Sequence, residues 1–412
     1  MIPVPFRTFI VKVSSRCNLN CTYCYEYNLG DSSWQRLPKV ISPQTTTRLA
    51  RRIREHALSH GLEGVNVLLH GGEPLLLGKD GLREFVTLLR SGLGDLPVAF
   101  DMQSNGTLLD QEWVQLLRSL QLQIGISIDG TRENHDRYRV DHSGRGSYAK
   151  VMAGLAHLQT EEGRGVFTSC FNVIDPHTDP IATYESLLRS GAPVIDFLLP
   201  LAHWDRPEPS KASDPWGSTP MADWLIPIFD LWFSRDYPRI SIRMFEELLL
   251  RIIGAPGVIE MYGIEPVAIV CIATDGAIEG VDSLKAAGSQ QHLGLNIRDH
   301  SFDEALKHPS VAMRQSGSHQ LGDKCQKCDL MAICGGGYLP HRWSSRSGFK
   351  NPSLYCADLT KLILHIKLRL REELTRSQAR ASAERLAPPI LLADGQVLPP
   401  QVAGISDPAG YG

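Results

Sequence analysis

The sequence predicts an α/β protein built on a parallel sheet, followed by a second region that carries cysteines. Over the first half of the chain, short apolar runs typical of strands alternate with amphipathic stretches typical of helices, in six repeats. Strands separated by helices form parallel sheets with right-handed crossovers. Four further cysteines gather between residues 325 and 356. Periodicity alone leaves open whether the sheet closes into a barrel.

The candidate elements alternate in order along the chain. We expect strands at residues 9–13, 65–70, 98–103, 124–128, 166–173 and 194–199. We expect helices between them at residues 43–57, 81–89, 112–120, 148–158 and 182–189. Ser42-Pro43 suits a helix start, because Ser caps first-turn N–H groups and Pro lacks the N–H that would be left unpaired.

Composition sets the class of protein. A chain of 412 residues exceeds one ordinary core, so we expect a large domain and a smaller one. Its net charge of −3 gives no basic footprint for nucleic acid, and no apolar run approaches the roughly 18 residues of a membrane span. The start lacks a signal peptide, which predicts a cytoplasmic protein. A chain with nine cysteines and no export signal favours metal ligation over a disulfide framework.

Cys17, Cys21 and Cys24 form the string CNLNCTYC directly after the first predicted strand. Three thiolates leave one coordination position open for chemistry, whereas four close a site. The string, with Tyr23 beside its last cysteine, resembles the cluster-binding loop of radical S-adenosylmethionine (SAM) enzymes. The resemblance implies a [4Fe–4S] cluster on these thiolates with SAM bound at the fourth iron. The alternative is structural zinc or chance spacing, although no His or Cys follows closely as a fourth zinc ligand.

Two turns at predicted strand ends extend this resemblance. Strand 65–70 runs into Gly71-Gly72-Glu73-Pro74, and strand 98–103 runs into Ser104-Asn105-Gly106. The first matches the GGEP motif that contacts the amino group of SAM in this family. The second falls where the family places the ribose and methionyl part of SAM. Each string alone would be an ordinary turn.

Three further positions match the family at later strands. Ser127, followed twelve residues later by Arg139, resembles the pair that binds the ribose and carboxylate of SAM in related peptide-modifying enzymes. A guanidinium can grip a carboxylate through two hydrogen bonds. Leu199 falls where family members pack apolar side chains against the adenine. Without the family context, Arg139 is a surface charge and Leu199 a core residue.

The resemblance covers about residues 7–200 and implies a partial (βα)6 barrel. We expect the barrel domain at residues 1–220, linker helices at 221–258, a cysteine-bearing domain at 259–365, and a C-terminal helix with a loosely ordered tail at 366–412.

Cys325, Cys328, Cys334 and Cys356 give four thiolates for a closed site, and their chemistry alone permits zinc or iron–sulfur. The pattern resembles the SPASM extension of radical SAM peptide maturases, which implies an auxiliary [4Fe–4S] cluster.

The cysteine set is incomplete compared with that extension, which has seven cysteines and two clusters. The next ligand position after Cys334 holds Gly335-Gly336-Gly337 and Tyr338, and Val281 stands where another cysteine is expected. Cys170 and Cys271 lie in apolar runs and are expected to be core residues. We therefore expect one auxiliary cluster.

The strings CGGGYLPHRWSSRSGFKNPSLYCADL and TDGAIEGVDSLK resemble the cyclophane-forming subgroup of radical SAM/SPASM maturases of ribosomally made peptides. That resemblance implies a carbon–carbon bond between an aromatic ring and a nearby side-chain carbon. It implies a precursor peptide and an external electron donor of flavodoxin or ferredoxin type as partners. One alternative is an enzyme that makes a thioether, an ether or an oxidised side chain, as sulfatase maturases do. The other is a zinc-stabilised binding protein without catalysis.

Loss of a ring proton requires a base. Asp282 falls where related sulfatase-maturing enzymes keep a catalytic Asp, although an Asp capping a turn after Gly280 is an equal alternative. Asp205, in the loop that follows the sixth strand, is a second candidate. His341 and Arg342 contact peptide or satisfy carbonyls. The first strand begins by about residue 9, so any leader peptide would be recognised by the linker helices, the second domain or a separate protein.

Overall fold

The computed structural model describes residues 3–257, 259–386, 390–391 and 397–398. Met1–Leu362 form one compact unit, called the catalytic unit below, and Ile363–Gly412 form a second. The domain borders predicted at residues 220 and 258 therefore lie inside the catalytic unit. Most of the tail predicted at 366–412 lies outside the described residues once α13 (Cys356–Leu386) has ended.

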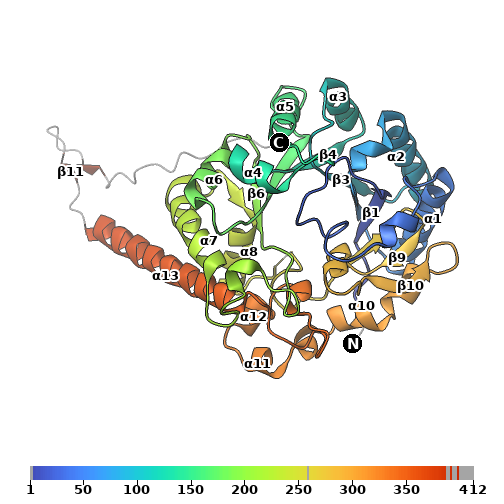
Figure 1. Cartoon of the computed structure of the whole chain (residues 1–412). Coiled ribbons are helices and arrows are strands. Elements are labelled where there is room, and N and C mark those ends of the chain that lie inside the picture. Colours follow the sequence, from blue (N-terminus) through green and yellow to red (C-terminus); the bar gives the residue numbers. More distant parts are fainter. Residues whose placement is uncertain (1–2, 258, 387–389, 392–396, 399–412) are drawn as a thin grey trace. The chain divides into compact units, whose positions relative to one another are not determined.

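One mixed sheet organises the catalytic unit. Its order among the described residues is β10-β9-β8-β1-β2-β3-β4-β5-β6-β7. Strands β8 and β1 to β7 pair in parallel, while β9 and β10 are antiparallel. The strands curve around an interior with helices outside, and β10 and β7 are edges, so the barrel is partial (Figure 1). The predicted α/β fold with a partial barrel is confirmed.

The strands and helices alternate as the sequence predicts. The strands are β1 (Thr8–Ser14), β2 (Val65–Gly71), β3 (Val98–Ser104), β4 (Leu122–Ser127), β5 (Phe167–Val173), β6 (Val194–Leu198) and β7 (Ser241–Ile242). The helices are α1 (Pro43–Ser59), α2 (Lys79–Leu93), α3 (Gln111–Ser119), α4 (Arg132–Tyr138), α5 (Tyr148–Leu158), α6 (Pro180–Leu188), α7 (Pro220–Leu231) and α8 (Arg243–Ile252). The Ser42 side chain accepts the Thr45 N–H at 3.1 Å, as expected of a cap.

The second cysteine-bearing region continues the same sheet. Strands β8 (Ile269–Ile272), β9 (Ala277–Glu279) and β10 (His292–Asn296) extend it beyond β1, and β8 pairs with β1. Short helices α9 (Phe302–Leu306), α10 (Pro309–Arg314), α11 (Asp323–Gln326) and α12 (Met331–Cys334) follow, with 3-10 turns η5 (Asp282–Ala286) and η7 (Leu339–Arg342). The short strands β11 (Ile390–Leu391) and β12 (Val397–Leu398) pair in the second unit.

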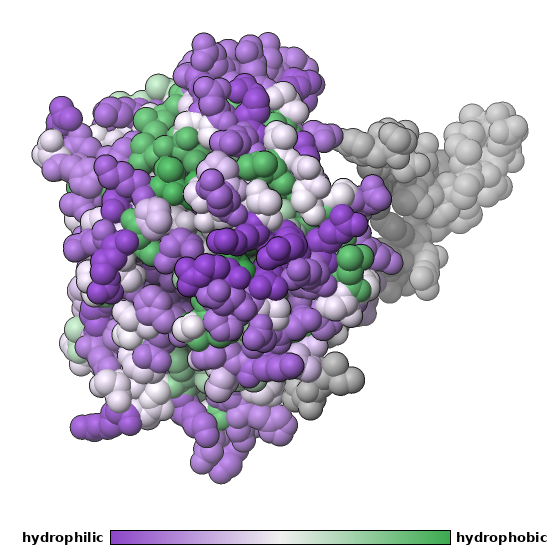
Figure 2. Space-filling model, turned by 90° about the vertical axis from the view of Figure 1, so that its right-hand side faces the viewer, coloured by the Kyte–Doolittle hydropathy of each residue, from purple (hydrophilic) through white to green (hydrophobic). Residues whose placement is uncertain are grey.

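The face of the catalytic unit that carries α1 and α2 is covered mainly by hydrophilic side chains (Figure 2). Within the described residues, no helix is both long and apolar enough to span a membrane. The apolar core lies between the sheet and its helices, and includes Val11, Val67, Leu69 and Ile124, each without exposed surface.

Candidate active site and cysteine clusters

The loop with the first three cysteines is held from two sides. It leaves β1 at Ser14 and then runs beside the segment after α4, where the Asn20 N–H donates to the Val140 carbonyl at 2.7 Å and the Thr22 N–H to the Tyr138 carbonyl at 3.0 Å. These bonds place the cysteines at the carboxyl ends of the strands, where parallel α/β proteins bind their ligands.

The three thiols have surroundings that suit metal ligation. Burial raises the pKa of Cys24 to about 12, and it raises the pKa of Cys17 and Cys21 as well. The thiols are therefore neutral without a metal, and cluster binding must displace their protons. Cys17 Sγ accepts hydrogen bonds from the Leu19 N–H at 3.3 Å and from Asn105 Nδ2 at 3.7 Å. Such donors would stabilise a thiolate.

The two glycines before Glu73 serve the cluster loop. The Gly72 N–H donates to the Ser14 carbonyl, and the Glu73 N–H donates to the Arg16 carbonyl, both at 2.9 Å. A Cβ on Gly72 would lie 1.9 Å from the Tyr27 hydroxyl. Glycine is therefore needed here because the end of β2 packs directly against the backbone just before Cys17, which leaves no room for a side chain.

Glu73 joins the ends of β2 and β3. Its carboxylate, which has no exposed surface, accepts hydrogen bonds from the Leu75 N–H at 3.0 Å, the Ser104 hydroxyl at 2.8 Å and the Asn105 N–H at 2.8 Å. Burial raises its pKa to about 7 despite these donors. The predicted contact with the amino group of SAM would have to share these oxygens. Pro74 follows as the buried first residue of the 3-10 turn η2 (Pro74–Leu77).

Arg139 forms a buried ion pair instead of standing open for a ligand. Its Nε lies 2.9 Å from Asp129 Oδ2, and its Nη2 donates to Asp129 Oδ1 at 3.3 Å. The Tyr23 hydroxyl also donates to Asp129, and the guanidinium lies over the Tyr23 ring at 5.5 Å. Ser127, buried at the end of β4, accepts a weak 3.4 Å hydrogen bond from Gln103. The resemblance implies that Arg139 binds the carboxylate of SAM. With Nε and Nη2 bonded to Asp129, Nη1 is the guanidinium nitrogen that could make this contact.

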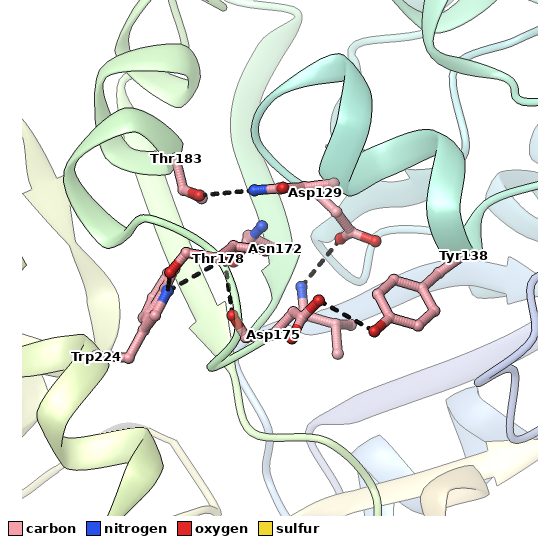
Figure 3. Close-up of a pocket in the computed structure, with 9 residues that line it drawn as sticks. Asp129, Tyr138, Asn172, Asp175, Thr178, Thr183 and Trp224 are labelled. Carbon is pink, nitrogen blue, oxygen red and sulfur yellow. Dashed lines mark hydrogen bonds between the residues drawn. The ribbon is translucent and has the colours of Figure 1, made fainter. Parts of the chain in front are cut away.

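A small pocket lies behind Asp129 (Figure 3). Its volume of about 10 Å³ suits a single water molecule. Asn172 Oδ1 in its wall is buried and has no hydrogen-bond partner among the residues that the structure describes. Asp175 accepts hydrogen bonds from the Tyr138 hydroxyl at 3.0 Å and from Arg137 at 2.8 Å. We therefore regard the pocket as a water site that supports Asp129.

The predicted base Asp282 lies beside the cluster loop. It begins η5, and its Oδ2 accepts the hydroxyl of Tyr25, the residue after Cys24, at 2.8 Å. Lys12 Nζ of β1 lies 3.9 Å from Oδ2, and His70 Nδ1 of β2 lies 3.5 Å from it. Burial alone would raise the pKa of Asp282, but Lys12, His70 and Tyr25 hold it below its usual value. A buried, ionised carboxylate beside the cluster loop can accept a proton.

Sequence reasoning missed the charges around Asp282. The Glu26 carboxylate accepts hydrogen bonds from the ammonium groups of both Lys12 and Lys285, and Lys285 Nζ lies 2.6 Å from Glu26 Oε2. All three side chains are buried. A lysine inside the apolar strand FIVKV is the one signal that could have revealed this network, because a buried lysine requires a partner.

The structure places the other predicted residues away from this network. Asp205 Oδ1 accepts the Ser344 hydroxyl at 3.0 Å and its Oδ2 accepts the Ser345 N–H at 2.6 Å, so it anchors an exposed turn. We assign it no proton transfer. Leu199 follows β6 and is half-buried, and the next carbonyl, that of Pro200, accepts the Tyr355 hydroxyl at 2.9 Å. His341 and Arg342 are buried, and Arg342 donates to the Phe349 carbonyl at 3.0 Å, which matches the predicted role of satisfying carbonyls for Arg342 alone. Among the described residues, neither ring nitrogen of His341 has a hydrogen-bond partner.

The four later cysteines face one another. Cys334 interacts electrostatically with the other three, and burial raises its pKa to about 12. Yet among the described residues, only His56, His60 and Asp303 put three acidic, histidine or cysteine donor atoms within 4.8 Å of one another. The chemistry of the four thiols fits either zinc or a [4Fe–4S] cluster.

The His56 group is not a metal site. His56 Nε2 accepts the Phe6 N–H at 3.0 Å, so the ring proton lies on Nδ1, which donates to Asp303 Oδ1 at 2.5 Å. A protonated nitrogen cannot ligate a metal. The group joins α1 to α9.

Other side chains fill the place of the missing cysteines. Val281 packs with Leu284, Ala287 and Leu339 in an apolar cluster. The Tyr338 hydroxyl lies 2.5 Å from Ser283 Oγ and donates to Glu260 at 3.2 Å. Cys170 and Cys271 are fully buried. This arrangement agrees with a single auxiliary cluster.

Comparisons with known proteins identify the fold. Residues 11–180 match the Radical SAM superfamily. The chain is 26% identical over 84% of its length to a cysteine-type anaerobic sulfatase-maturating enzyme of Clostridium novyi, of which it covers 91%. It is 24% identical over 82% of its length to a serine-type enzyme of Klebsiella aerogenes, of which it covers 81%.

Two solved structures share the fold. The first is native anSMEcpe with bound AdoMet, with a TM-score of 0.76 at 22% identity over 90% of this chain and 99% of that one. The second is Streptococcus suis SuiB bound to its precursor peptide SuiA, with a TM-score of 0.57 at 14% identity over 86% of this chain and 76% of that one. The chain therefore has a radical SAM fold and is an enzyme whose cofactors are a [4Fe–4S] cluster and SAM.

Proposed function

We propose that this radical SAM enzyme modifies a ribosomally made precursor peptide by joining an aromatic ring to a nearby side-chain carbon, which forms a cyclophane. A peptide or protein substrate is supported by its similarity to sulfatase-maturating enzymes and by the fold that it shares with SuiB bound to SuiA. The finer proposal, cyclophane formation, is supported by the C-terminal strings and by the incomplete cysteine set.

The cysteines divide between two clusters in this proposal. Cys17, Cys21 and Cys24 would hold the cluster that binds SAM, and the reduced cluster with SAM would supply the radical chemistry that removes a hydrogen atom from the peptide. Cys325, Cys328, Cys334 and Cys356 hold the auxiliary cluster, which would supply an electron acceptor. An external flavodoxin or ferredoxin supplies the reducing electron.

The chain's own residues position the substrate and move the proton. Asn105 and the Leu19 N–H stabilise Cys17 as a thiolate. Glu73 and the Arg139–Asp129 pair fix the strand ends around the SAM site. Asp282, kept ionised by Lys12 and Tyr25, takes the proton that the ring loses when its aromaticity returns. The buried carboxylate next to the cluster loop is the observation that carries this mechanism.

A second candidate is oxidation of a cysteine or serine side chain, favoured by the similarity to sulfatase-maturating enzymes of both types. Asp282 would serve there too, because that oxidation also releases a proton. Thioether and ether formation belong to the same group of alternatives.

The proposal is tested by incubating the anaerobically reconstituted enzyme with SAM, dithionite and candidate peptides, and by analysing the products. We expect 5′-deoxyadenosine and a peptide lighter by two hydrogens, with fragment ions that join the aromatic residue to its partner. A product that reacts with a hydrazine reagent would be an aldehyde and would favour the second candidate. Stoichiometric zinc without iron, or no 5′-deoxyadenosine, would contradict radical chemistry altogether.

A further inference from the structure

His70 lies beside the predicted base and has a nitrogen without a hydrogen bond. It is the register partner of Lys12 across β1 and β2, so both side chains lie on the same face of the sheet. Its Nδ1 is buried, has no hydrogen-bond partner in the described part of the chain, and lies 3.5 Å from Asp282 Oδ2. The side chain is 15% exposed. No motif used above assigns His70 a role.

A base that acts repeatedly must give up its proton, and the hydrogen-bonding neighbours of Asp282 cannot take it. The Tyr25 hydroxyl donates to Oδ2, and the Ser283 N–H donates to Oδ1 at 2.9 Å. Neither neighbour is a base for this proton, because one is a neutral phenol that already donates its own proton to Oδ2 and the other is a backbone amide.

The charged and thiol neighbours cannot take the proton either. Burial alone would lower the pKa of Lys12, but Glu26 and other acidic groups raise it, so it stays an ammonium. Burial keeps the Cys271 thiol protonated by raising its pKa. Glu26 is occupied by Lys12 and Lys285. Glu279 faces Lys12 but has no hydrogen bond or ion pair to Asp282 among the described residues.

We propose that His70 accepts the proton that Asp282 removes from the substrate. The Asp282 Oδ2–H bond breaks, an N–H bond forms at His70 Nδ1, and the products are a carboxylate and an imidazolium. No electron moves in this step. The geometry allows this transfer, because the buried Nδ1 lies 3.5 Å from Oδ2 and has no other hydrogen-bond partner in the described part of the chain. The partly exposed ring then releases its proton to solvent. This inference rests on the proposed function, since it assumes that Asp282 is the base.

Chemical rescue tests this role, because a merely structural histidine is not replaced by free imidazole. The probes are synthetic peptides with an aromatic residue two positions from a potential partner, and a cysteine peptide for the second candidate function. For His70→Ala in the holoenzyme we expect about 10- to 100-fold less product per 5′-deoxyadenosine, with 5′-deoxyadenosine formation itself retained. Added imidazole should restore the product, more so as pH rises and imidazole loses its proton.

Leu68→Ala is the matched control, since Leu68 lies two residues earlier on the same face of β2 and its side chain has no atom that can accept a proton. Imidazole should not change its product yield. Unchanged product in His70→Ala, or lost product that imidazole does not restore, would overturn the inference.

A crystal structure of the SAM-bound holoenzyme gives a result that needs no substrate. We expect His70 Nδ1 to lie about 3.5 Å from Asp282 Oδ2, as here, with no donor at Nδ1, so that its lone pair can receive the proton once Asp282 carries one. A separation of about 4 Å or more, or another donor at Nδ1, would refute the relay. If the wild type makes 5′-deoxyadenosine but modifies no probe, the proposed peptide chemistry fails, and this structure still decides the role of His70.

Discussion

At the scale of single residues, the motifs identified the side chains predicted to bind a cofactor. They did not identify the buried charged residues that surround these side chains. Cys17 and Glu73 stand in recognisable strings, whereas Lys12, Glu26 and Lys285 have no motif. These three meet because β1, the cluster loop and η5 converge in space, which the sequence order does not reveal. Arg139 shows the same limit, since its pairing with Asp129 needed the position of α4.

Replacing Asp282 by Asn should separate radical formation from product formation. The amide cannot accept the proton, so we expect product per enzyme to fall about 10²- to 10⁴-fold while 5′-deoxyadenosine is still made. Liquid chromatography with mass spectrometry measures both. Asp205→Asn is the control, because Asp205 anchors an exposed turn, and its product yield should stay near the wild-type value. Loss of product in the control but not in Asp282→Asn would reverse the assignment.

Glu73 should make the cofactor-free protein less stable as pH rises. Its pKa in the folded state, about 7, is above the ordinary value of 4.5, so between these values the folded protein binds a proton that the unfolded chain lacks. The free energy of unfolding should therefore fall from about pH 4.5 to about pH 7, by at most about 3 kcal/mol, and stay level above. Urea unfolding across this range in wild type and Glu73→Gln measures it. An unfolding free energy that changes equally with pH in both proteins would contradict this.

At the scale of elements, the sequence predicted which strands and helices exist because each has a clear period. The predicted ends of α1 and α5 lie close to the observed ones, because a helix cap and a polar turn mark them in the sequence. Helix α4 was missed, because RENHDRY has no apolar face. The GGEP turn was recognised as a predicted SAM contact, and the structure adds that its glycines are needed for contact with the cluster loop.

Gly72→Ala should therefore disturb the first cluster. The new Cβ would meet the Tyr27 hydroxyl at 1.9 Å and the Arg16 carbonyl at 2.3 Å, which forces the cluster loop to move. We expect a destabilisation of about 1–3 kcal/mol and lower iron content after reconstitution. Thermal unfolding and iron analysis measure these effects.

Gly78→Ala is the matched control for that variant. Gly78 has φ +79, but its Cβ would meet nothing within 4 Å. Only the backbone cost of about 1–3 kcal/mol should appear, with normal iron content, so iron content is the measurement that separates the two variants. Equal iron loss in both variants would show that backbone strain, not the loop contact, matters.

The loop after β6 is fixed by one buried ion pair. Lys211 Nζ lies 2.8 Å from Asp358 Oδ2, and Asp358 Oδ1 accepts the first free N–H groups of α7 at 2.8 and 3.1 Å. Lys211→Met leaves a buried carboxylate without its cation, so we expect a loss of about 3–5 kcal/mol in chemical unfolding. Lys361→Met removes an exposed lysine from its pair with Asp223 and should cost under about 1 kcal/mol. Similar losses of unfolding free energy in Lys211→Met and Lys361→Met would contradict the expectation that only the buried ion pair is important for stability.

At the scale of the whole molecule, the sequence suggested separate domains, whereas β8, β9 and β10 extend the barrel sheet. Strand pairing between β1 and β8 joins residues about 260 positions apart, which no local period reveals. The cofactor chemistry was nonetheless readable from cysteine spacing, because ligand spacing is local even when the fold is not.

Counting iron tests how the whole chain divides its cysteines. The wild type should bind about eight irons and eight sulfides, as two [4Fe–4S] clusters require. Replacing Cys17, Cys21 and Cys24 by Ala should leave about four irons and no 5′-deoxyadenosine. Replacing Cys325 and Cys328 should also leave about four, with 5′-deoxyadenosine retained. Cys271→Ala should keep about eight, because Cys271 lies inside the sheet with Lys12. About twelve irons would mean that a second auxiliary cluster forms despite Val281 and Tyr338, and zinc in the Cys325 site would remove the electron acceptor from the proposed mechanism.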